Sequence, residues 1–224
     1  MGELEGFAAR LGHPFADPAL LEQALTHRSA GGRHNERLEF LGDALLGLVI
    51  ADELYRLRPH ADEGELSRMR ASLVRRETLA ELARNLDLGD HLRLGAGELK
   101  SGGYRRDSVL ANGLEALIGA AYLDGGFAAG RALLLRLYAE RLANLPLQGP
   151  EKDPKTRLQE YLQARGLPLP EYHVVEVAGE DHDRTYTVTC RVDGLALPLN
   201  GVGLSRRKAE QAAACNALAR LADD

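Results

Sequence analysis

Three acidic residues that could bind a metal ion lie close together in the first quarter of the chain. Glu36, Glu39 and Asp43 belong to the stretch HNERLEFLGD and are spaced three and four residues apart. Because each residue of an α-helix advances by about 100°, their side chains would fall within about 60° of one another. The opposite side would carry Leu38, Leu41, Leu45 and Leu48. The run after Asp43 is apolar nearly all round, which is typical of a helix buried from several sides.

A second apolar segment carries two more oxygen-bearing side chains. Asn112 and Glu115 are three residues apart in ANGLEALIG and would project from the same side of a helix, and Glu63 stands at the start of another helix. Any one of these acids, taken alone, is also explained by a solvated helix face. Several converging carboxylates would raise one another's pKa, and a hard cation such as Mg²⁺ would relieve that repulsion and bind a substrate phosphate. Periodicity alone does not bring the helices together.

The composition excludes several classes of protein. The chain has 224 residues, a formal net charge of −5 and two cysteines, Cys190 and Cys215, neither of which lies in a CxxC or Cys/His pattern. A zinc site is therefore not expected, and any basic surface must be local. The charged start MGELEGFAARLGHPF lacks the apolar core of a signal peptide, and no run is long enough to span a bilayer. We expect a soluble, cytoplasmic protein with reduced cysteines and no membrane partner.

The order of the expected elements divides the chain into two domains. Residues 1–147 show helical patterns and no evident strand. The apolar helix that contains ANGLEALIG should end at Gly125 and Gly126, and a further helix should run to about Asn144. The stretch LPLQGPEKDP changes the pattern with three prolines, a glycine and charges, and indicates a linker at residues 148–153. Residues 154–224 then follow the order helix, three strands, helix. The fold class is thus α+β: an all-helical domain followed by a small α-β-β-β-α domain.

HNERLEFLGD resembles the signature motif of the ribonuclease III family, and the resemblance extends along nearly the whole chain. Further matching motifs occur in order and at the family's spacings. They are LTHRS (25–29), DEGELSRMRASLV (62–74), LGAGELKSGG (94–103), EALIGAAYLD (115–124), DPKTRLQEYLQ (153–163) and SRRKAEQAAA (205–214). One such motif could arise by chance, whereas this many in order make the resemblance to the bacterial members of the family specific.

The resemblance implies a helical endonuclease domain followed by a double-stranded RNA-binding domain. It also implies an obligate homodimer with one active site per subunit, which cuts both strands of a duplex. The implied reaction depends on Mg²⁺, which Mn²⁺ could replace, and leaves 5′-phosphate and 3′-hydroxyl ends with short 3′ overhangs. Its expected substrates are precursors of ribosomal RNA and structured messenger RNAs. A metal ion can activate water and stabilise a leaving oxygen, so no Ser-His-Asp or Cys-His arrangement is required.

The resemblance assigns metal binding to Glu39, Asn112 and Glu115, and catalysis to Asp43 and Glu115, with Asp43 organising the metal site. Position 112 departs from the family pattern, which usually has Asp there. An Asn offers a neutral oxygen that could still bind metal, but with less charge to hold Mg²⁺. Three outcomes remain open: an active enzyme, a weakened metal site, or a non-catalytic double-stranded RNA-binding regulator. We favour the active enzyme because the three carboxylates are all present.

Three further positions of the first domain acquire roles from the resemblance. Glu36 and Glu63 match outer acids that interact with each other and face the RNA. Phe40, beside the acidic residues, matches an aromatic residue packed across the dimer interface. The alternative for Phe40 is a plain core phenylalanine.

The second domain contains a basic segment that suits phosphate. In SRRKAE, three cations would occupy the first turn of the last helix, where backbone N–H groups already favour anions. A solvated basic turn is the alternative. The resemblance implies RNA contacts at Thr156, Gln159, Glu160, His182, Ser205, Arg206, Arg207 and Lys208. Such domains recognise the shape of A-form RNA rather than its sequence, and their affinity depends strongly on salt.

Two other motifs have weaker implications. The glycine-rich stretch GAGELKSGG lacks the GK[ST] ending of a P-loop and follows no strand, so no nucleotide cofactor is expected, although its loop position suits an approaching RNA. The stretch THRS (26–29) could line the RNA path or cap a helix. A metal-dependent phosphohydrolase acting on small molecules is a third functional class, but it leaves the second domain unexplained.

Overall fold

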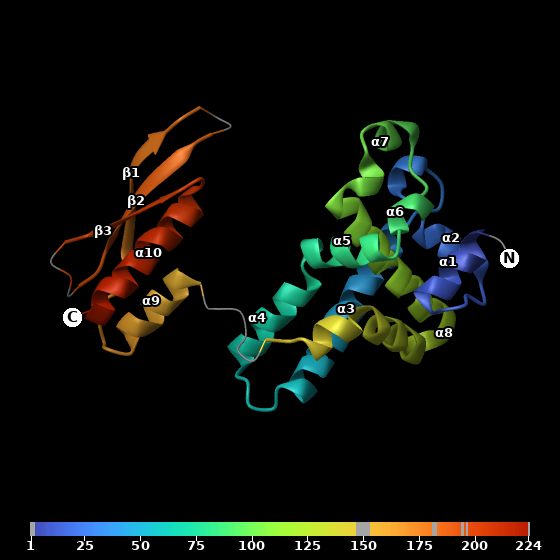
Figure 1. Ribbon diagram of the computed structural model, residues 1–224, viewed down its shortest axis with the longest axis horizontal. Helices are drawn as coiled ribbons and strands as arrows, with labels where there is room; N and C mark the ends of the chain where they lie inside the picture. The colour runs from blue at the N-terminus through green and yellow to red at the C-terminus, as the bar shows by residue number, and fades with distance from the viewer. Residues whose placement is uncertain (1–2, 147–152, 181–182, 194, 196, 224) are drawn as a thin grey trace. The chain divides into compact units, whose positions relative to one another are not determined.

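The computed structural model describes residues 3–146, 153–180, 183–193, 195 and 197–223 (Figure 1). The chain divides into two compact units, Met1–Pro150 and Glu151–Asp224. The linker expected at residues 148–153 lies outside the described residues except for Asp153.

The first unit is helical, as the sequence predicts, and its described residues contain no strand. Its elements are α1 (Glu3–Leu11), α2 (Pro18–Ala24), η1 (Arg28–Ala30), α3 (Glu36–Leu57), α4 (Glu63–Val74), α5 (Arg76–Asn85), α6 (Leu88–His91), α7 (Ala96–Lys100), η2 (Gly103–Arg105) and α8 (Asp107–Ala143). The break expected at Gly126 is confirmed. There α8 is interrupted by a residue with φ 75° and ψ −172°, a conformation that glycine adopts without steric cost.

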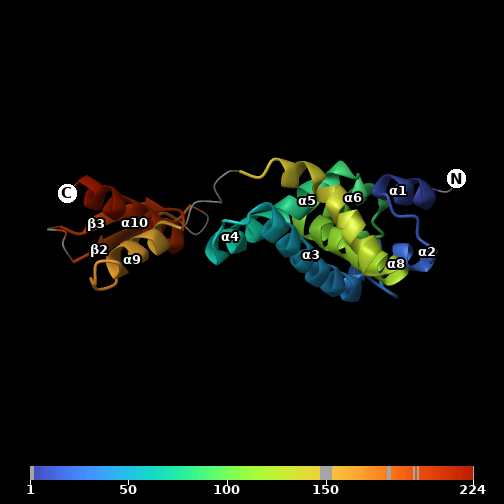
Figure 2. The same ribbon diagram turned by 90° about the horizontal axis from the view of Figure 1, so that it is seen from below.

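Helices α3 and α8 pack against each other at the centre of the first unit (Figure 2). Their fully buried side chains include Leu46 and Ile50 from α3 and Leu114 and Leu117 from α8. Helices α2 and α5 pack against α8, and α4 packs against α3. The prediction that α3 is buried from several sides is confirmed only in part, because Leu48, expected on the core side, is 58% exposed.

Two glycines let the backbones of α3 and α8 come into direct contact. A Cβ atom on Gly42 of α3 would overlap the carbonyl oxygen of Glu115, and one on Gly119 of α8 would overlap the carbonyl oxygen of Leu38. In both cases the obstacle is main chain rather than a flexible side chain, so no rotamer change can make room. The crossing therefore requires glycine on both helices, and it brings Glu115 next to the start of α3.

The second unit has the α-β-β-β-α order that the sequence predicts. Its elements are α9 (Pro154–Gln163), β1 (Glu171–Ala178), β2 (Thr185–Arg191), β3 (Leu199–Gly203) and α10 (Arg206–Asp223). The strands form an antiparallel sheet in the order β1-β2-β3, and α10 packs against α9, β2 and β3. The core includes Leu158, Leu162, Cys190 and Ala213, so the alternating pattern of β2 places Cys190 inside.

No helix among the described residues is both long and apolar enough to cross a membrane. Cys190 is buried and Cys215 is exposed, and both are free thiols.

The substitution Gly119→Ala should destabilise the first unit by about 3 kcal/mol, because the added methyl group must push two helix backbones apart. Urea unfolding followed by circular dichroism measures this loss. Gly6→Ala in α1 is the matched control, since nothing lies within 4 Å of its added Cβ and alanine favours a helix by about 1 kcal/mol over glycine. Equal stability of the two variants would contradict the direct backbone contact.

Candidate active site

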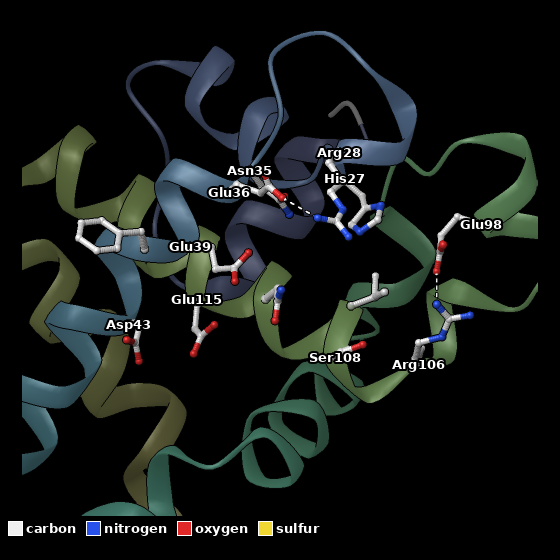
Figure 3. Close-up of a pocket in the computed structure, with 13 residues that line it drawn as sticks. His27, Arg28, Asn35, Glu36, Glu39, Asp43, Glu98, Arg106, Ser108 and Glu115 are labelled. Atoms are coloured by element: carbon white, nitrogen blue, oxygen red, sulfur yellow. Dashed lines mark hydrogen bonds and ion pairs between the residues drawn. The ribbon is translucent and has the colours of Figure 1, made fainter.

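A polar cavity of about 610 Å³ lies where α3 crosses α8. Its walls come from α3, α8, the segment around η1 and the segment around α7. The lining residues are His27, Arg28, Asn35, Glu36, Glu39, Phe40, Asp43, Glu98, Arg106, Ser108, Val109, Asn112 and Glu115. Figure 3 shows the carboxylates of Glu39, Asp43 and Glu115 gathered between the two helices. The structure thus brings together all four residues that the sequence predicts for metal binding and catalysis.

The electrostatics of the cavity show that its acids are close and incompletely compensated. Burial and the negative charges of Asp43 and Glu39 raise the pKa of Glu115 to about 7, although Arg76 opposes the rise. Burial and the charge of Glu36 likewise raise the pKa of Glu39. Both shifts have the causes expected for carboxylates that share a partly desolvated site. The cavity therefore holds more negative charge than its own cations neutralise.

Asn112 lines the same cavity as Glu39. The interaction of its amide with the Glu39 carboxylate lowers the pKa of Glu39 and so opposes part of the rise. An Asp at this position would be acceptor-only when ionised and would add a further negative charge. The departure from the family pattern therefore replaces a negative charge with a neutral amide whose interaction favours the ionised form of Glu39.

The donor atoms of the cavity suit a hard cation. Glu39, Asp43 and Glu115 offer carboxylate oxygens and Asn112 an amide oxygen, the ligand type of Mg²⁺, whereas zinc sites favour nitrogen and sulfur. Within the described part of the chain, no three His, Cys, Asp or Glu side chains are close enough to form a ready coordination shell. Two features explain this. The carboxylates repel one another when no cation lies between them, and the fourth proposed ligand is Asn112, which is not one of these four residue types.

Two ion pairs form the rim of the cavity. Arg28 donates to Glu36 at 3.1 Å, and Arg106 donates to Glu98 at 2.7 Å. Sequence reasoning named Glu36 but missed Arg28, Glu98 and Arg106. Arg28 lies in THRS, noted only as a stretch that could line the RNA path or cap a helix, and Glu98 lies in the glycine-rich stretch, noted only as a loop that suits an approaching RNA. Arg106 lies outside both stretches. These cations line the same cavity as the acids.

Glu63 does not line the cavity. It begins α4, where its carboxylate accepts a hydrogen bond from Ser67 Oγ at 2.7 Å. Glu36 is the first residue of α3, whereas Glu63 follows the C-terminal end of that helix. The 22 residues of α3 span about 33 Å at 1.5 Å per residue. The expected interaction between Glu36 and Glu63 is therefore not made within one subunit, because a whole helix separates the two acids.

An apolar stripe on α3 is exposed in the single chain. Phe40 is 79% exposed, Leu48 58% and Tyr55 73%. Their spacing of eight and seven residues places them on one side of the helix. The alternative that Phe40 is a core residue is wrong for the isolated subunit.

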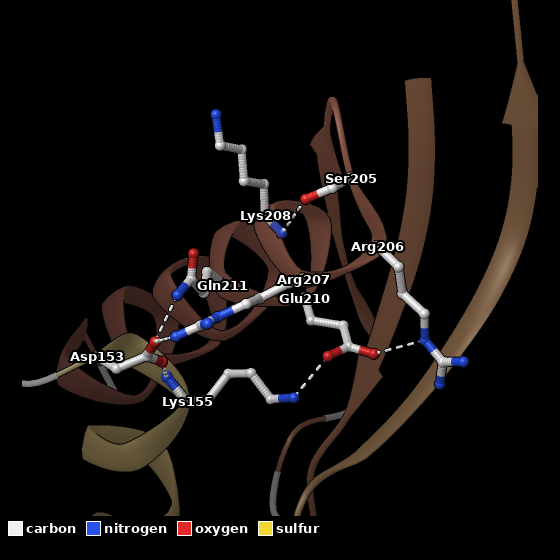
Figure 4. A network of polar contacts seen from close by, with 8 residues as sticks. All are labelled: Asp153, Lys155, Ser205, Arg206, Arg207, Lys208, Glu210 and Gln211. Carbon is white, nitrogen blue, oxygen red and sulfur yellow. Dashed lines mark hydrogen bonds and ion pairs between the residues drawn. The ribbon is translucent and has the colours of Figure 1, made fainter. Parts of the chain in front are cut away.

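The predicted RNA-contacting residues of the second unit that the structure describes lie on α9 and at the start of α10. Thr156, Gln159 and Glu160 are exposed on α9, at a spacing that gives them one helix face. Ser205 caps α10, accepting a hydrogen bond from the Lys208 amide at 3.3 Å, and the side chains of Arg206, Arg207 and Lys208 are exposed. Contacts between Lys155 and Glu210 and between Asp153 and Gln211 join the two helices (Figure 4). His182 lies outside the described residues.

Comparison with known proteins gives matches to both units. Residues 17–142 match the family model described as Ribonuclease-III-like, and residues 154–221 match the double-stranded RNA binding motif. The chain is 59% identical over 214 residues to Ribonuclease 3 of Alkalilimnicola ehrlichii, covering 96% of this chain and 94% of that protein. It is 58% identical over 213 residues to Ribonuclease 3 of Vibrio cholerae, covering 95% of each.

Solved structures match the first unit. The nuclease domain of ribonuclease III from Campylobacter jejuni aligns with a TM-score of 0.62 and 39% identity, covering 65% of this chain and all of that chain. A second structure of that domain, described by its flexibility in a region involved in dimer formation, aligns with a TM-score of 0.60 and 40% identity. It covers 62% of this chain and 97% of that chain.

Replacing Asn112 with Asp should make the metal-free protein less stable and more responsive to Mg²⁺. The variant loses the favourable interaction of the Asn112 amide with the Glu39 carboxylate and gains a repelling charge, at a cost of about 1–2 kcal/mol, or roughly 3–6 °C in the melting temperature. Thermal melts in EDTA and in Mg²⁺ measure both effects. Added Mg²⁺ should recover the loss, because the new carboxylate helps to hold the cation.

Asn85→Asp, the same substitution at an exposed position of α5, is the matched control and should change neither melt by more than about 1–2 °C. If Asn112→Asp behaved like this control, Asn112 would not belong to the acidic site.

Proposed function

The chain belongs to the ribonuclease III family, and from this membership we propose that the cavity between α3 and α8 is the active site of a double-strand-specific endoribonuclease. The protein cleaves double-stranded RNA and processes ribosomal and messenger RNA precursors. The observation that carries the proposal is the meeting of Glu39, Asp43 and Glu115 from two crossing helices, with Glu115 held at a pKa of about 7. The double-stranded RNA binding motif at residues 154–221 indicates that the substrate of this site is double-stranded RNA.

The family is metal-dependent, and the proposed metal is Mg²⁺, which Mn²⁺ could replace. Glu39 and Glu115 would hold it with their charge and Asn112 with its amide oxygen, while Asp43 beside Glu115 organises the site. When bound, such a cation lowers the pKa of water and stabilises negative charge on phosphate oxygens. The proposed ligands are oxygen atoms, most of them on carboxylates that repel one another. A bound cation relieves this repulsion, so it is held more tightly than it would be by neutral ligands.

The reaction adds one water molecule across the bond between phosphorus and the 3′ oxygen. The hydroxyl group goes to phosphorus, giving a 5′-phosphate, and the proton ends on the leaving oxygen, giving a 3′-hydroxyl. Arg28 and Arg106 contribute positive charge at the rim, and Glu36 and Glu98 fix the orientation of these two side chains. The chain thus supplies both negative and positive charge within one cavity, which favours a fixed orientation of the RNA backbone.

A homodimer is the assembly that the exposed stripe on α3 favours. An isolated subunit would leave Phe40, Leu48 and Tyr55 in water, although large apolar side chains are stabilised by burial. The related domain from Campylobacter jejuni is described as having a region involved in dimer formation. In a symmetric pair, each α3 would bury the same stripe on the other, and Glu63 would act in the dimer rather than beside Glu36 of its own subunit.

Double-stranded RNA would bind the second unit by its shape. Exposed polar side chains on α9 (Thr156, Gln159 and Glu160) suit 2′-hydroxyls of a minor groove, and the start of α10 suits phosphates across the major groove. His182 would provide the contact of the loop between β1 and β2. A non-catalytic RNA-binding regulator is not favoured, because Asn112 keeps its place beside Glu39 and the three carboxylates remain together.

Glu115→Gln should abolish cleavage and retain binding of duplex RNA. The substitution keeps the shape of the side chain and removes the charged ligand that α8 contributes, so a fall of at least about a thousandfold in the cleavage rate is expected. A labelled duplex of defined length, followed on denaturing and native gels, reports both properties.

Glu140→Gln removes a charge from an exposed position of the same helix and should cut at the wild-type rate. Full cleavage by Glu115→Gln at ordinary Mg²⁺ concentration would sink the active-site assignment. Loss of binding together with cutting would show a damaged fold instead.

A further inference from the structure

A nearly buried carboxylate lies behind the basic start of α10. The side chain of Glu210 is only 12% exposed, and its two oxygens are each taken by a cation. Lys155 Nζ, from α9, lies 2.6 Å from Oε2, and Arg206 Nε lies 2.9 Å from Oε1 (Figure 4). Glu210 thus joins the two helices that carry the proposed RNA contacts.

Both contacts pair a cation with the Glu210 carboxylate. Each is a charge-assisted hydrogen bond, the stronger class of such bonds in proteins. Lys155 is fixed a second time, because its Nζ lies 4.5 Å from the centre of the Tyr172 ring. The hydrogen bond from Lys155 is the main cause that lowers the pKa of Glu210, and the bond from Arg206 adds to it despite burial. Glu210 is therefore ionised at neutral pH and remains with its two cations.

The other two cations of the segment are differently placed. Arg207 is 81% exposed, and its nearest acid, Asp153, is 3.9 Å away. Lys208 has an exposed side chain with no acidic partner among the described residues, and Figure 4 shows it pointing away from the network around Glu210. The segment SRRK therefore presents two kinds of cation. Arg206 is 65% exposed but paired with the largely buried Glu210 carboxylate, whereas Arg207 and Lys208 have no acid within 3.5 Å among the described residues.

We propose that Glu210 withholds Lys155 and Arg206 from the RNA, so that Arg207 and Lys208 make the phosphate contacts and Glu210 limits the affinity of the domain. This inference rests on the proposed function, because it concerns binding of double-stranded RNA. A phosphate that approached Lys155 or Arg206 would also approach the Glu210 carboxylate, and the three charges sum to +1 rather than +2. Moderate affinity suits an enzyme that must release its products after each cut.

The salt dependence of RNA affinity measures how many phosphates the cations of the protein neutralise. Each phosphate neutralised by the protein adds about 0.9 to the slope of log affinity against log salt concentration. Without a divalent metal the protein should bind duplex RNA and not cut it. A labelled duplex titrated in EDTA at several salt concentrations therefore gives this slope for each variant. Lys208→Gln should lower the slope by about 0.9 and weaken binding about fivefold at low salt. Arg206→Gln and Lys155→Gln should leave the slope unchanged and the affinity within about twofold.

Removal of the carboxylate charge should have the opposite effect. Glu210→Gln keeps a hydrogen-bond acceptor and releases two cations, so affinity at low salt should rise about tenfold and the slope should steepen by about 1 to 2. Glu176→Gln, on the exposed face of β1, is the matched control, because it removes the same charge without releasing a cation. It should change the affinity less than about twofold and leave the slope unchanged.

The outcomes separate this inference from the proposed function. If Arg206→Gln lowered the slope as much as Lys208→Gln, Arg206 would be a phosphate contact and the inference would be overturned. The same conclusion would follow if Glu210→Gln kept its melting temperature but bound like the wild type. If Glu210→Gln failed to fold, the salt slopes of Arg206→Gln and Lys155→Gln would still test whether these two cations contact phosphate. Absence of salt-dependent duplex binding in the wild type would instead contradict the proposed function itself.

In multiple-turnover cleavage with Mg²⁺, Glu210→Gln should be slower than the wild type, because product leaves more slowly. Its single-turnover rate with enzyme in excess should be unchanged, since the residue lies in the second unit and not in the cavity. A weaker domain caused by loss of the tie between α9 and α10 would reduce RNA affinity and could not produce this split. An unchanged multiple-turnover rate would contradict the role in limiting product affinity.

Discussion

The contact between the backbones of α3 and α8 is the constraint on which the nuclease unit depends. Gly42 and Gly119 remove the side chains that would keep the two helices apart. The same crossing sets the acids of α3 beside Glu115, which is half-buried and held at a pKa of about 7. The crossing of α3 and α8 is thus the origin of both the close helix packing and the uncompensated negative charge in the cavity. The buried leucines on both helices supply the stability against which this repulsion acts.

The two units treat charge in opposite ways. In the first, the cations among the described residues leave Glu39 and Glu115 with raised pKa values, and the proposed metal ion would supply the missing positive charge. In the second, Glu210 has two cations of its own, which reduces what the domain can offer to the RNA. A tight active site combined with a moderate binding surface lets one RNA be cut and released, because strong binding of the product would slow turnover.

Much of the fold follows from the sequence by local rules. The helical first unit, the break at Gly126 and the order of the second unit were all predictable from periodicity and turn residues. The meeting of Glu39 and Glu115 came only from the resemblance, because it depends on a contact between distant helices. The exposure of Leu48 could not be predicted, since a core face and an interface have the same pattern. Arg106 was missed because its role comes from the fold around the cavity.

The most direct test of the account is cleavage of a labelled RNA duplex by the purified protein, compared in Mg²⁺, Ca²⁺ and EDTA, with the same strand unpaired as a second substrate. The account predicts that only the duplex in Mg²⁺ is cut, to short duplexes with 5′-phosphates, 3′-hydroxyls and short 3′ overhangs. Binding should persist in Ca²⁺ without cuts. A duplex that is retained but remains intact in Mg²⁺ would contradict the account and identify the chain as an RNA-binding protein without nuclease activity.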